Sequence, residues 1–201
     1  MSIVRSLFLV PVALALVAGG SLAATAGNAA PEFSLTDMSG KTVRLSDYKG
    51  KFVVLEWTNP ECPFVQAQYG ADAMQSLQKE AAGKGVVWLT INSTNQNHSE
   101  YKTGSQMNAW INARGAAPKD VLIDGTSETG RAYAAKTTPH MFVIDAAGNI
   151  VYSGAIDDKR SARESDRRIA NNYVRAALNE AVAGKPVTVA STTPYGCSIK
   201  Y

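Results

Sequence analysis

The chain has 201 residues, of which 45% are hydrophobic and 18% are charged, and its formal net charge is +3 at pH 7. This length supports one domain with a sizeable buried core. The near-neutral charge predicts no nucleic-acid partner, because binding to a phosphate backbone needs a strongly basic surface.

Residues 1–26 have the layout of a secretory signal peptide. Arg5 gives a positive start, an apolar run covers residues 7–18, and small residues lead to a cleavage site after Ala23 or Ala26. The run is shorter than the ~20 residues of a membrane-spanning helix. The small residues that follow it favour cleavage over an uncleaved anchor. We therefore expect an exported, periplasmic protein with no stable membrane contact after the signal is removed.

Residues 27–183 alternate between strand and helix patterns and are expected to form the domain. The expected elements are an edge strand at 42–45, a buried strand at 52–57, a helix at 64–82, a buried strand at 86–91, a helix at 106–113, a strand at 121–123, a helix at 128–135, strands at 141–144 and 150–152, and a helix at 166–183. A short connection containing glycine joins the last two strands, which predicts an antiparallel hairpin. This order predicts an α/β domain in which helices flank a mixed central sheet.

Charged residues are densest between Asp157 and Arg168, where acidic and basic side chains are mixed. A cluster of mixed sign is typical of a solvated loop and helix face. We therefore expect these side chains to face water.

Residues 184–201 differ in composition from the domain before them. Pro186, Pro194 and Gly196, together with several Ser and Thr residues, predict an extended, flexible tail. Cys197 lies near the end of this tail.

The other cysteine, Cys62, lies where the buried strand at 52–57 turns into the helix at 64–82. Pro63 suits the first position of a helix because it lacks an N–H group, and this places Cys62 at or near the N-cap. Unpaired amide dipoles there favour the thiolate and move a cysteine pKa from about 8.5 towards 3.5–7.5, whereas the adjacent carboxylate of Glu61 raises it. The placement indicates a redox nucleophile; the alternative is an inert packing residue.

Two cysteines in an exported chain permit one intramolecular bridge, between Cys62 and Cys197. Cys197 either resolves an intermediate at Cys62 during turnover or forms a static bridge that staples the tail. The entropy cost of closing a loop of about 135 residues grows only logarithmically with length, so the separation permits either role.

The sequence resembles the thioredoxin superfamily and, more narrowly, its peroxiredoxin-like branch of alkyl hydroperoxide reductase and thiol-specific antioxidant proteins. The resemblance covers roughly residues 30–183. Its strongest marks are WTNPECPFV at 57–65, TTPHMFVID at 137–145, Gly148 and GAIDD at 154–158. It implies a thioredoxin-like (redoxin) domain with antioxidant activity or a role in cell redox homeostasis, and without a cofactor or a bound metal.

The chain departs from both patterns that define the reactive turn in these families. Thioredoxins carry Cys-x-x-Cys, whereas Val65 stands three residues after Cys62. Peroxiredoxins carry Pro-x-x-x-Thr-x-x-Cys, whereas Leu55 and Asn59 occupy those positions and Thr58 is one residue away. The departures weaken the peroxidase interpretation.

The resemblance also implies a second part of the site. It implies that Pro139 is cis and lies against Cys62, and that Thr138 offers its backbone to an extended partner. His140 then either tunes Cys62 or shuttles a proton, or it begins a strand and packs. The expected site-supporting residues are Thr58, Asn59, Pro60, Thr138, Pro139 and His140.

The sequence therefore predicts a thiol-based oxidoreductase in which Cys62 attacks a disulfide or a peroxide and Cys197 or an external thiol resolves the product. Its expected partners are a disulfide-containing protein or a small peroxide as substrate, and an external thiol as reductant. One alternative is a copper carrier that uses Cys62, Cys197 and His140 as ligands, although such carriers usually have paired cysteines close in sequence. Another is a redox-inert module that binds an extended peptide at Thr138-Pro139.

Overall fold

The computed structural model describes residues 24–201, and most of the predicted signal peptide lies outside these described residues. The first described residue, Ala24, is buried in the core. The Gly27 amide then donates to the Ile150 carbonyl, and Ala29 pairs with Asn149. Within residues 24–201, no helix has the length and apolar character needed to cross a membrane.

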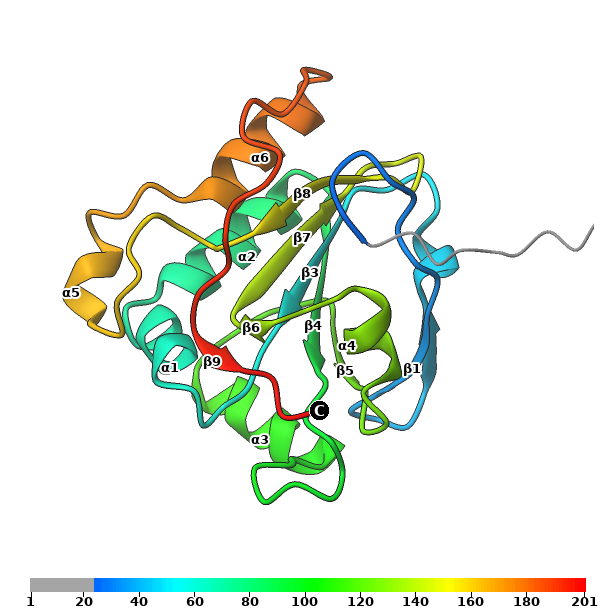
Figure 1. The fold of residues 1–201 in the computed structure, drawn as a ribbon, viewed down its shortest axis with the longest axis vertical. Coiled ribbons are helices and arrows are strands. Elements are labelled where there is room, and N and C mark those ends of the chain that lie inside the picture. Colours follow the sequence, from blue (N-terminus) through cyan, green and yellow to red (C-terminus); the bar gives the residue numbers. More distant parts are fainter. Residues whose placement is uncertain (1–23) are drawn as a thin grey trace, which may run out of the picture.

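A seven-stranded mixed sheet forms the centre of the molecule (Figure 1), in the order β2-β1-β5-β4-β3-β7-β8. Its strands are β1 (Ser34–Asp37), β2 (Thr42–Arg44), β3 (Val53–Trp57), β4 (Val87–Asn92), β5 (Asp120–Ile123), β7 (His140–Ile144) and β8 (Ile150–Gly154). Strands β3, β4 and β5 are parallel, and β7 joins β3 and β8 in antiparallel pairs. The predicted buried strands, hairpin and edge strand are confirmed, whereas β1 is an additional strand.

Every residue of β3 and β4 is buried, as expected for strands covered on both faces. The helical segments that cover the sheet are η1 (Leu45–Tyr48), α1 (Pro63–Gly70), α2 (Ala73–Gly83), α3 (Gly104–Ala113), α4 (Glu128–Ala132), α5 (Glu164–Arg167) and α6 (Tyr173–Val182). One core cluster contains Val65, Leu77 and Leu178 from α1, α2 and α6. The cluster on the other face contains Leu45 from η1 and Tyr133, which follows α4.

Two predicted helices are each split in two. The helix expected at 64–82 breaks at Asp72, whose φ of 58° is left-handed, and the helix expected at 166–183 divides into α5 and α6. At the first break α1 packs against α5 so closely that a Cβ on Gly70 would overlap the Glu164 carboxylate. The capping side chain of Asn172 starts α6 by accepting from the Arg175 amide at 2.8 Å.

The C-terminal segment, residues 190–201, crosses the molecule as an extended strap and ends beyond β9 (Figure 1). It is extended, as expected, but it is docked on the domain rather than free. The Ser153 amide donates to the Ala190 carbonyl and the Thr192 amide donates to the Ser153 carbonyl, both at 3.1 Å. Further on, β9 (Cys197–Ser198) pairs in antiparallel fashion with β6 (Thr137–Thr138).

Candidate active site

Cys62 is the N-cap of α1 and Pro63 is the first helical residue, as the sequence predicts. Its side chain is only 1% exposed. The sulfur lies 3.0 Å from the Thr138 carbonyl oxygen and 2.7 Å from the sulfur of Cys197. Among the described residues it makes no capping hydrogen bond to the amides of α1. The helix end is therefore close to the sulfur, but the hydrogen-bond partners of the sulfur are the Thr138 carbonyl and Cys197 rather than the expected amide donors.

Hydrogen bonds fix the turn that precedes Cys62. The Asn59 carbonyl accepts from the Cys62 amide at 3.0 Å, and the Asn59 side chain accepts from the Glu61 amide at 2.9 Å. Asn59 Nδ2 donates to Glu100 at 2.7 Å, and the Pro60 carbonyl accepts from Gln66 Nε2 at 2.9 Å. Asn59 and Pro60 therefore fix the backbone of this turn.

The Thr138-Pro139 bond is cis, as the resemblance implied, and the Thr138 carbonyl lies against the Cys62 sulfur. The backbone of Thr138 pairs with Cys197 of the strap, so the expected extended partner is this chain's own C-terminal segment. Gly196 permits the approach, because a Cβ there would overlap the Thr138 carbonyl and its φ is 134°. The buried hydroxyls of Thr58 and Thr138 have no hydrogen-bond partner within residues 24–201.

The two sulfurs differ in their surroundings. Cys62 is buried, Cys197 is partly exposed, and no disulfide joins them. Burial, the hydrogen bond with Cys62 and the negative charge of Cys62 raise the pKa of Cys197 to about 12. Its surroundings therefore disfavour the thiolate form of Cys197.

The carboxylate of Glu61, which was expected to oppose a thiolate at Cys62, is paired. Lys102 Nζ lies 2.6 Å from Glu61 Oε1, and the Glu61 side chain is half exposed. Solvent screens such a pair strongly, so its energetic effect is small. The lysine nevertheless offsets part of the negative charge next to the cysteine.

His140 begins β7 and packs, in agreement with the second of its two expected roles. Its ring centroid lies 4.6 Å from that of Phe142, which belongs to the core cluster on the face opposite to Cys62. Its Nδ1 accepts from the Lys136 amide at 3.2 Å. The three side chains expected for a copper carrier, Cys62, Cys197 and His140, therefore do not converge.

The burial of His140 predicts a pH dependence of stability. Burial, followed by the charge of Lys136, lowers the pKa of His140 to about 4 from a usual 6.5. The unfolded chain thus takes up a proton before the folded protein does, so this contribution is complete above pH 6.5 and is lost as the pH falls through 4. We expect a loss of up to about 3 kcal/mol in the free energy of unfolding, from 1.36 kcal/mol per pKa unit.

Urea unfolding of the native protein and of His140→Gln between pH 7 and 4 measures this loss. The glutamine variant keeps every other titrating group. The difference between the two proteins in how steeply the free energy of unfolding falls as the pH falls is therefore the contribution of His140. Parallel curves for the two proteins over this range would contradict the prediction.

Asp157 and Arg167 form a buried ion pair, which corrects the expectation that their charge cluster faces water. Their side chains are 2% and 1% exposed, and Arg167 Nη1 lies 2.8 Å from Asp157 Oδ2. The Tyr195 hydroxyl of the strap donates to Asp157 Oδ1 at 2.5 Å and accepts from Arg167 Nη1 at 2.8 Å. Sequence pattern missed this network because mixed charges in a loop usually face solvent.

A buried carboxyl group, Glu56, lies in the middle of β3 and is fully inaccessible. Its oxygens accept from the Tyr69 hydroxyl at 2.8 Å, from Trp88 Nε1 at 2.9 Å and from the Thr90 hydroxyl at 3.1 Å. Burial outweighs these donors and raises its pKa. The signal that identifies it in the sequence is one acidic residue inside an otherwise apolar strand.

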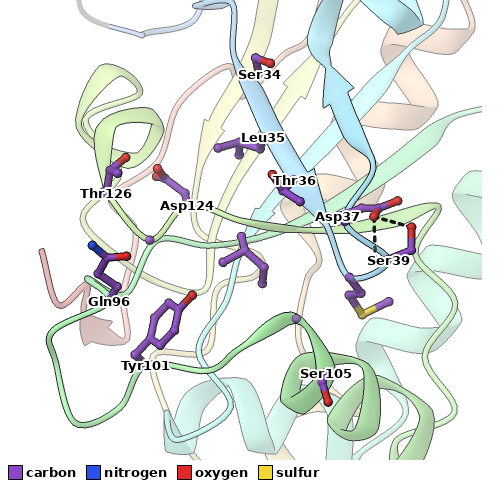
Figure 2. Close-up of a pocket in the computed structure, with 15 residues that line it drawn as sticks. Ser34, Leu35, Thr36, Asp37, Ser39, Gln96, Tyr101, Ser105, Asp124 and Thr126 are labelled. Carbon is purple, nitrogen blue, oxygen red and sulfur yellow. Dashed lines mark hydrogen bonds between the residues drawn. The ribbon is translucent and has the colours of Figure 1, made fainter.

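A hollow of about 620 Å³ opens elsewhere, on the β1 side of the sheet (Figure 2). Its lining comes from β1, from the loop that contains Gln96 and Tyr101, and from the turn after β5 that contains Asp124. At its rim, the Asp37 carboxylate accepts hydrogen bonds from the amide and the hydroxyl of Ser39 (Figure 2). The two cysteines lie at the β3–α1 turn and in β9, so the thiol chemistry does not use this hollow.

Comparison with known proteins gives relatives of matching fold. The chain is 30% identical to the thioredoxin-like protein YneN of Bacillus subtilis over 142 residues, which are 70% of this chain and 78% of YneN. It is 27% identical to the thiol-disulfide oxidoreductase ResA of Geobacillus kaustophilus over 135 residues, or 64% of this chain and 68% of ResA.

Among solved structures, an uncharacterized conserved protein of Geobacillus kaustophilus superposes with a TM-score of 0.76 at 30% identity, covering 89% of this chain and 93% of the other. The family model described as AhpC/TSA family matches residues 26–153, which include β3, Cys62 and the cis-proline turn. The chain belongs to the AhpC/TSA family and has a thioredoxin-like fold.

Proposed function

We propose that this protein is a thiol–disulfide oxidoreductase in which Cys62 is the nucleophile and Cys197 resolves the intermediate. The observation that carries the proposal is the 2.7 Å separation of the two sulfurs, brought together at the cis-proline turn from distant parts of the chain. The name of the relative ResA, a thiol-disulfide oxidoreductase, supports the same chemistry.

The reaction proceeds by two exchanges. The Cys62 thiolate attacks one sulfur of a substrate disulfide, forming a mixed disulfide and releasing the other substrate sulfur as a thiolate. Cys197 then attacks Cys62, which forms the Cys62–Cys197 bond and breaks the bond to the substrate. The proton of Cys197 goes to the departing substrate sulfur. The substrate thiolate released first takes up the proton that Cys62 lost on ionising, so the substrate disulfide is reduced to two thiols and the cysteine pair is oxidised. An external thiol reductant then restores the pair.

Access to Cys62 requires movement of the end of the strap. Cys62 is buried beneath residues that include Cys197, whereas Cys197 itself is partly exposed. The pairing of β9 with β6 comprises two residue pairs, Thr137 with Ser198 and Thr138 with Cys197. When β9 moves away, the backbone groups of Thr138 become free to pair with another strand. An extended segment of a disulfide-containing polypeptide can then take the place of β9.

A disulfide is the preferred substrate over a peroxide. The threonine that activates peroxide in peroxiredoxins is replaced by Asn59, whose side chain instead holds the turn through Glu61 and Glu100. The proposal includes export to an oxidising, periplasmic compartment, which the signal-like residues 1–26 support.

Trapping of the mixed disulfide tests the proposal. Cys197→Ser is expected to accumulate a stable adduct at Cys62 when it is mixed with oxidised glutathione or a disulfide-containing protein, because the resolving thiol is missing. Cys62→Ser is expected to form none above background. Mass spectrometry of the intact proteins reads both results, and absence of the adduct in Cys197→Ser would refute the nucleophilic role of Cys62.

The native protein serves as the matched reference. It is expected to show no lasting adduct and to lose two hydrogens as the Cys62–Cys197 bridge forms. The same assay with hydrogen peroxide distinguishes the substrate classes: a faster reaction with peroxide than with a disulfide would contradict the substrate preference given above.

A further inference from the structure

The strap reaches the active site through one strongly bound residue, Tyr195, two positions before Cys197. Tyr195 is 5% exposed and its ring packs edge-on against Phe64 of α1, with 5.9 Å between centroids. Its hydroxyl bonds to both members of the buried Asp157–Arg167 pair. Phe64, two positions after Cys62, and Tyr195, two positions before Cys197, are thus packed against each other.

The ion pair under Tyr195 has its polar groups satisfied on several sides. Gln68 of α1 donates to Asp157 Oδ2 at 2.7 Å, and Arg167 Nη2 donates to the carbonyls of Lys159 and Ser161 at 2.7 and 2.9 Å. Buried charges cost desolvation energy, so such a network adds geometric definition more than net stability. Here the defined geometry is that of α1 relative to the strap.

The domain is shaped to receive the strap upstream of Tyr195 as well. The Thr192 hydroxyl accepts from the Ala155 amide at 2.9 Å and contacts the Tyr152 hydroxyl at 2.6 Å. A Cβ on Gly154 would overlap the backbone of Thr192. These contacts lead the chain to Tyr195, and from there only Gly196 separates the anchor from Cys197.

We propose that Tyr195, held by the buried Asp157–Arg167 pair, is a positioning residue for the resolving step. It holds the Cys197 thiol against Cys62 and so sets the effective concentration of that thiol. The inference rests on the proposed function, because it explains why Cys197 attacks the mixed disulfide at Cys62 efficiently. In the step concerned, the Cys197–Cys62 bond forms, the bond between Cys62 and the substrate sulfur breaks, and the proton of Cys197 leaves with the substrate thiol.

The physical reason is entropic. Without the Tyr195 anchor, the chain that carries Cys197 would be held upstream only as far as Thr192, and the effective concentration would move towards the millimolar range of a flexible linker. A docked strap holds the same sulfur at 2.7 Å. Well-oriented intramolecular groups reach effective concentrations far above those of flexible ones.

The experiment measures the equilibrium between the Cys62–Cys197 bridge and glutathione in the full-length protein. Tyr195→Phe keeps the ring against Phe64 and removes only the hydroxyl and its two bonds to charged groups. We expect the effective concentration of the Cys197 thiol to fall about ten- to a hundredfold. A tenfold fall corresponds to a rise of about 30 mV in the reduction potential.

Tyr48→Phe is the matched control. The Tyr48 hydroxyl also donates to a carboxylate, that of Asp120, at 2.7 Å, but both residues are far along the chain from the strap. It is expected to leave the glutathione equilibrium unchanged. Gly196→Ala is a second test variant that displaces the strap from Thr138 and is expected to act in the same direction as Tyr195→Phe. Near-ultraviolet circular dichroism of each reduced variant confirms that it is folded.

The outcomes separate the two claims. An equilibrium in Tyr195→Phe equal to that of the native protein, or an equal fall in Tyr48→Phe, overturns the positioning role while the proposed function stands. A native protein that forms no Cys62–Cys197 bridge in any glutathione mixture overturns both. An unchanged yield of the Cys62–glutathione adduct when Tyr195→Phe is combined with Cys197→Ser confirms that the loss lies in resolution and not in the first attack.

Discussion

Replacing Cys62 with serine is expected to lower the rate of disulfide reduction to the uncatalysed background, a loss of at least about a thousandfold. A neutral hydroxyl is far less nucleophilic than a thiolate and cannot form the mixed disulfide on which both steps depend. A steady-state assay with a protein disulfide and dithiothreitol, corrected for the reductant alone, measures the loss.

Cys197→Ser is expected to behave differently from Cys62→Ser in the same assay. It keeps the first attack, so turnover continues at the rate at which the external thiol resolves the adduct and becomes proportional to the concentration of that thiol. A rate equal to that of the native protein, with no dependence on added thiol, would eliminate the internal resolving role of Cys197.

A one-residue displacement of the thiol is the sharpest control for this prediction. Side chains at successive positions of a strand point to opposite faces. Combining Cys197→Ser with Ser198→Cys therefore keeps the number of thiols but directs the new one away from Cys62 in β9. We expect no rescue of thiol-independent turnover, and full rescue would show that mere proximity of a tail cysteine is sufficient.

Replacing Glu56 with alanine is expected to lower the free energy of unfolding by about 3–5 kcal/mol. The change removes the acceptor for Tyr69, Trp88 and Thr90, whose donors then stay buried without a partner, at roughly 1–3 kcal/mol each and not additively. It also leaves a cavity beside β3. Urea unfolding monitored by tryptophan fluorescence measures the difference; a loss below about 1 kcal/mol would contradict the prediction.

The matched variant Glu56→Gln keeps the volume and one acceptor oxygen but turns an amide group towards donors. We expect a loss in the free energy of unfolding that is smaller than that of Glu56→Ala. The pH dependence of this loss follows from the raised pKa of Glu56. The folded protein holds the proton to higher pH than the unfolded chain, so this stabilisation is complete below the unfolded pKa and is lost as the pH rises through the folded pKa. The stability gap between native protein and Glu56→Gln therefore narrows as the pH rises.

The order of elements was predictable because it depends on local patterns. The apolar runs at 52–57 and 86–91 became the two fully buried strands, and the turn residues at 145–149 became the hairpin connection between β7 and β8. Pro63 placed the helix start correctly, and with it Cys62. These features need only neighbours in sequence to be recognised.

The helix breaks were not predictable in the same way. Both ends of the expected helix at 64–82 were helical, and the break between α1 and α2 depends on Asp72 adopting a left-handed conformation and on α5 packing close to Gly70. The partner, Glu164, is far away in the sequence. The helical pattern of apolar residues runs on through the break, because helix propensity depends on neighbouring residues and not on a contact with a residue far away in the sequence.

Residues of the candidate site could be predicted from the sequence only where they belong to a family pattern or are cysteines. Cys62, Cys197, Thr138 and Pro139 come together as expected. The anchor of the strap was missed, because the burial of Asp157 and Arg167 depends on Tyr195 covering them from a segment whose composition suggests a loose tail. Charge pattern alone cannot distinguish a solvated cluster from one that another part of the chain later covers.

The wide separation of the two cysteines along the sequence has a consequence for biosynthesis. The two cysteines are 135 positions apart, so at 5–20 residues per second a ribosome adds the second roughly 7–27 s after the first. Throughout that interval the nascent polypeptide carries a single thiol, and any disulfide it makes is with another molecule. Correct pairing is therefore a late event, which waits until the strap has been synthesised.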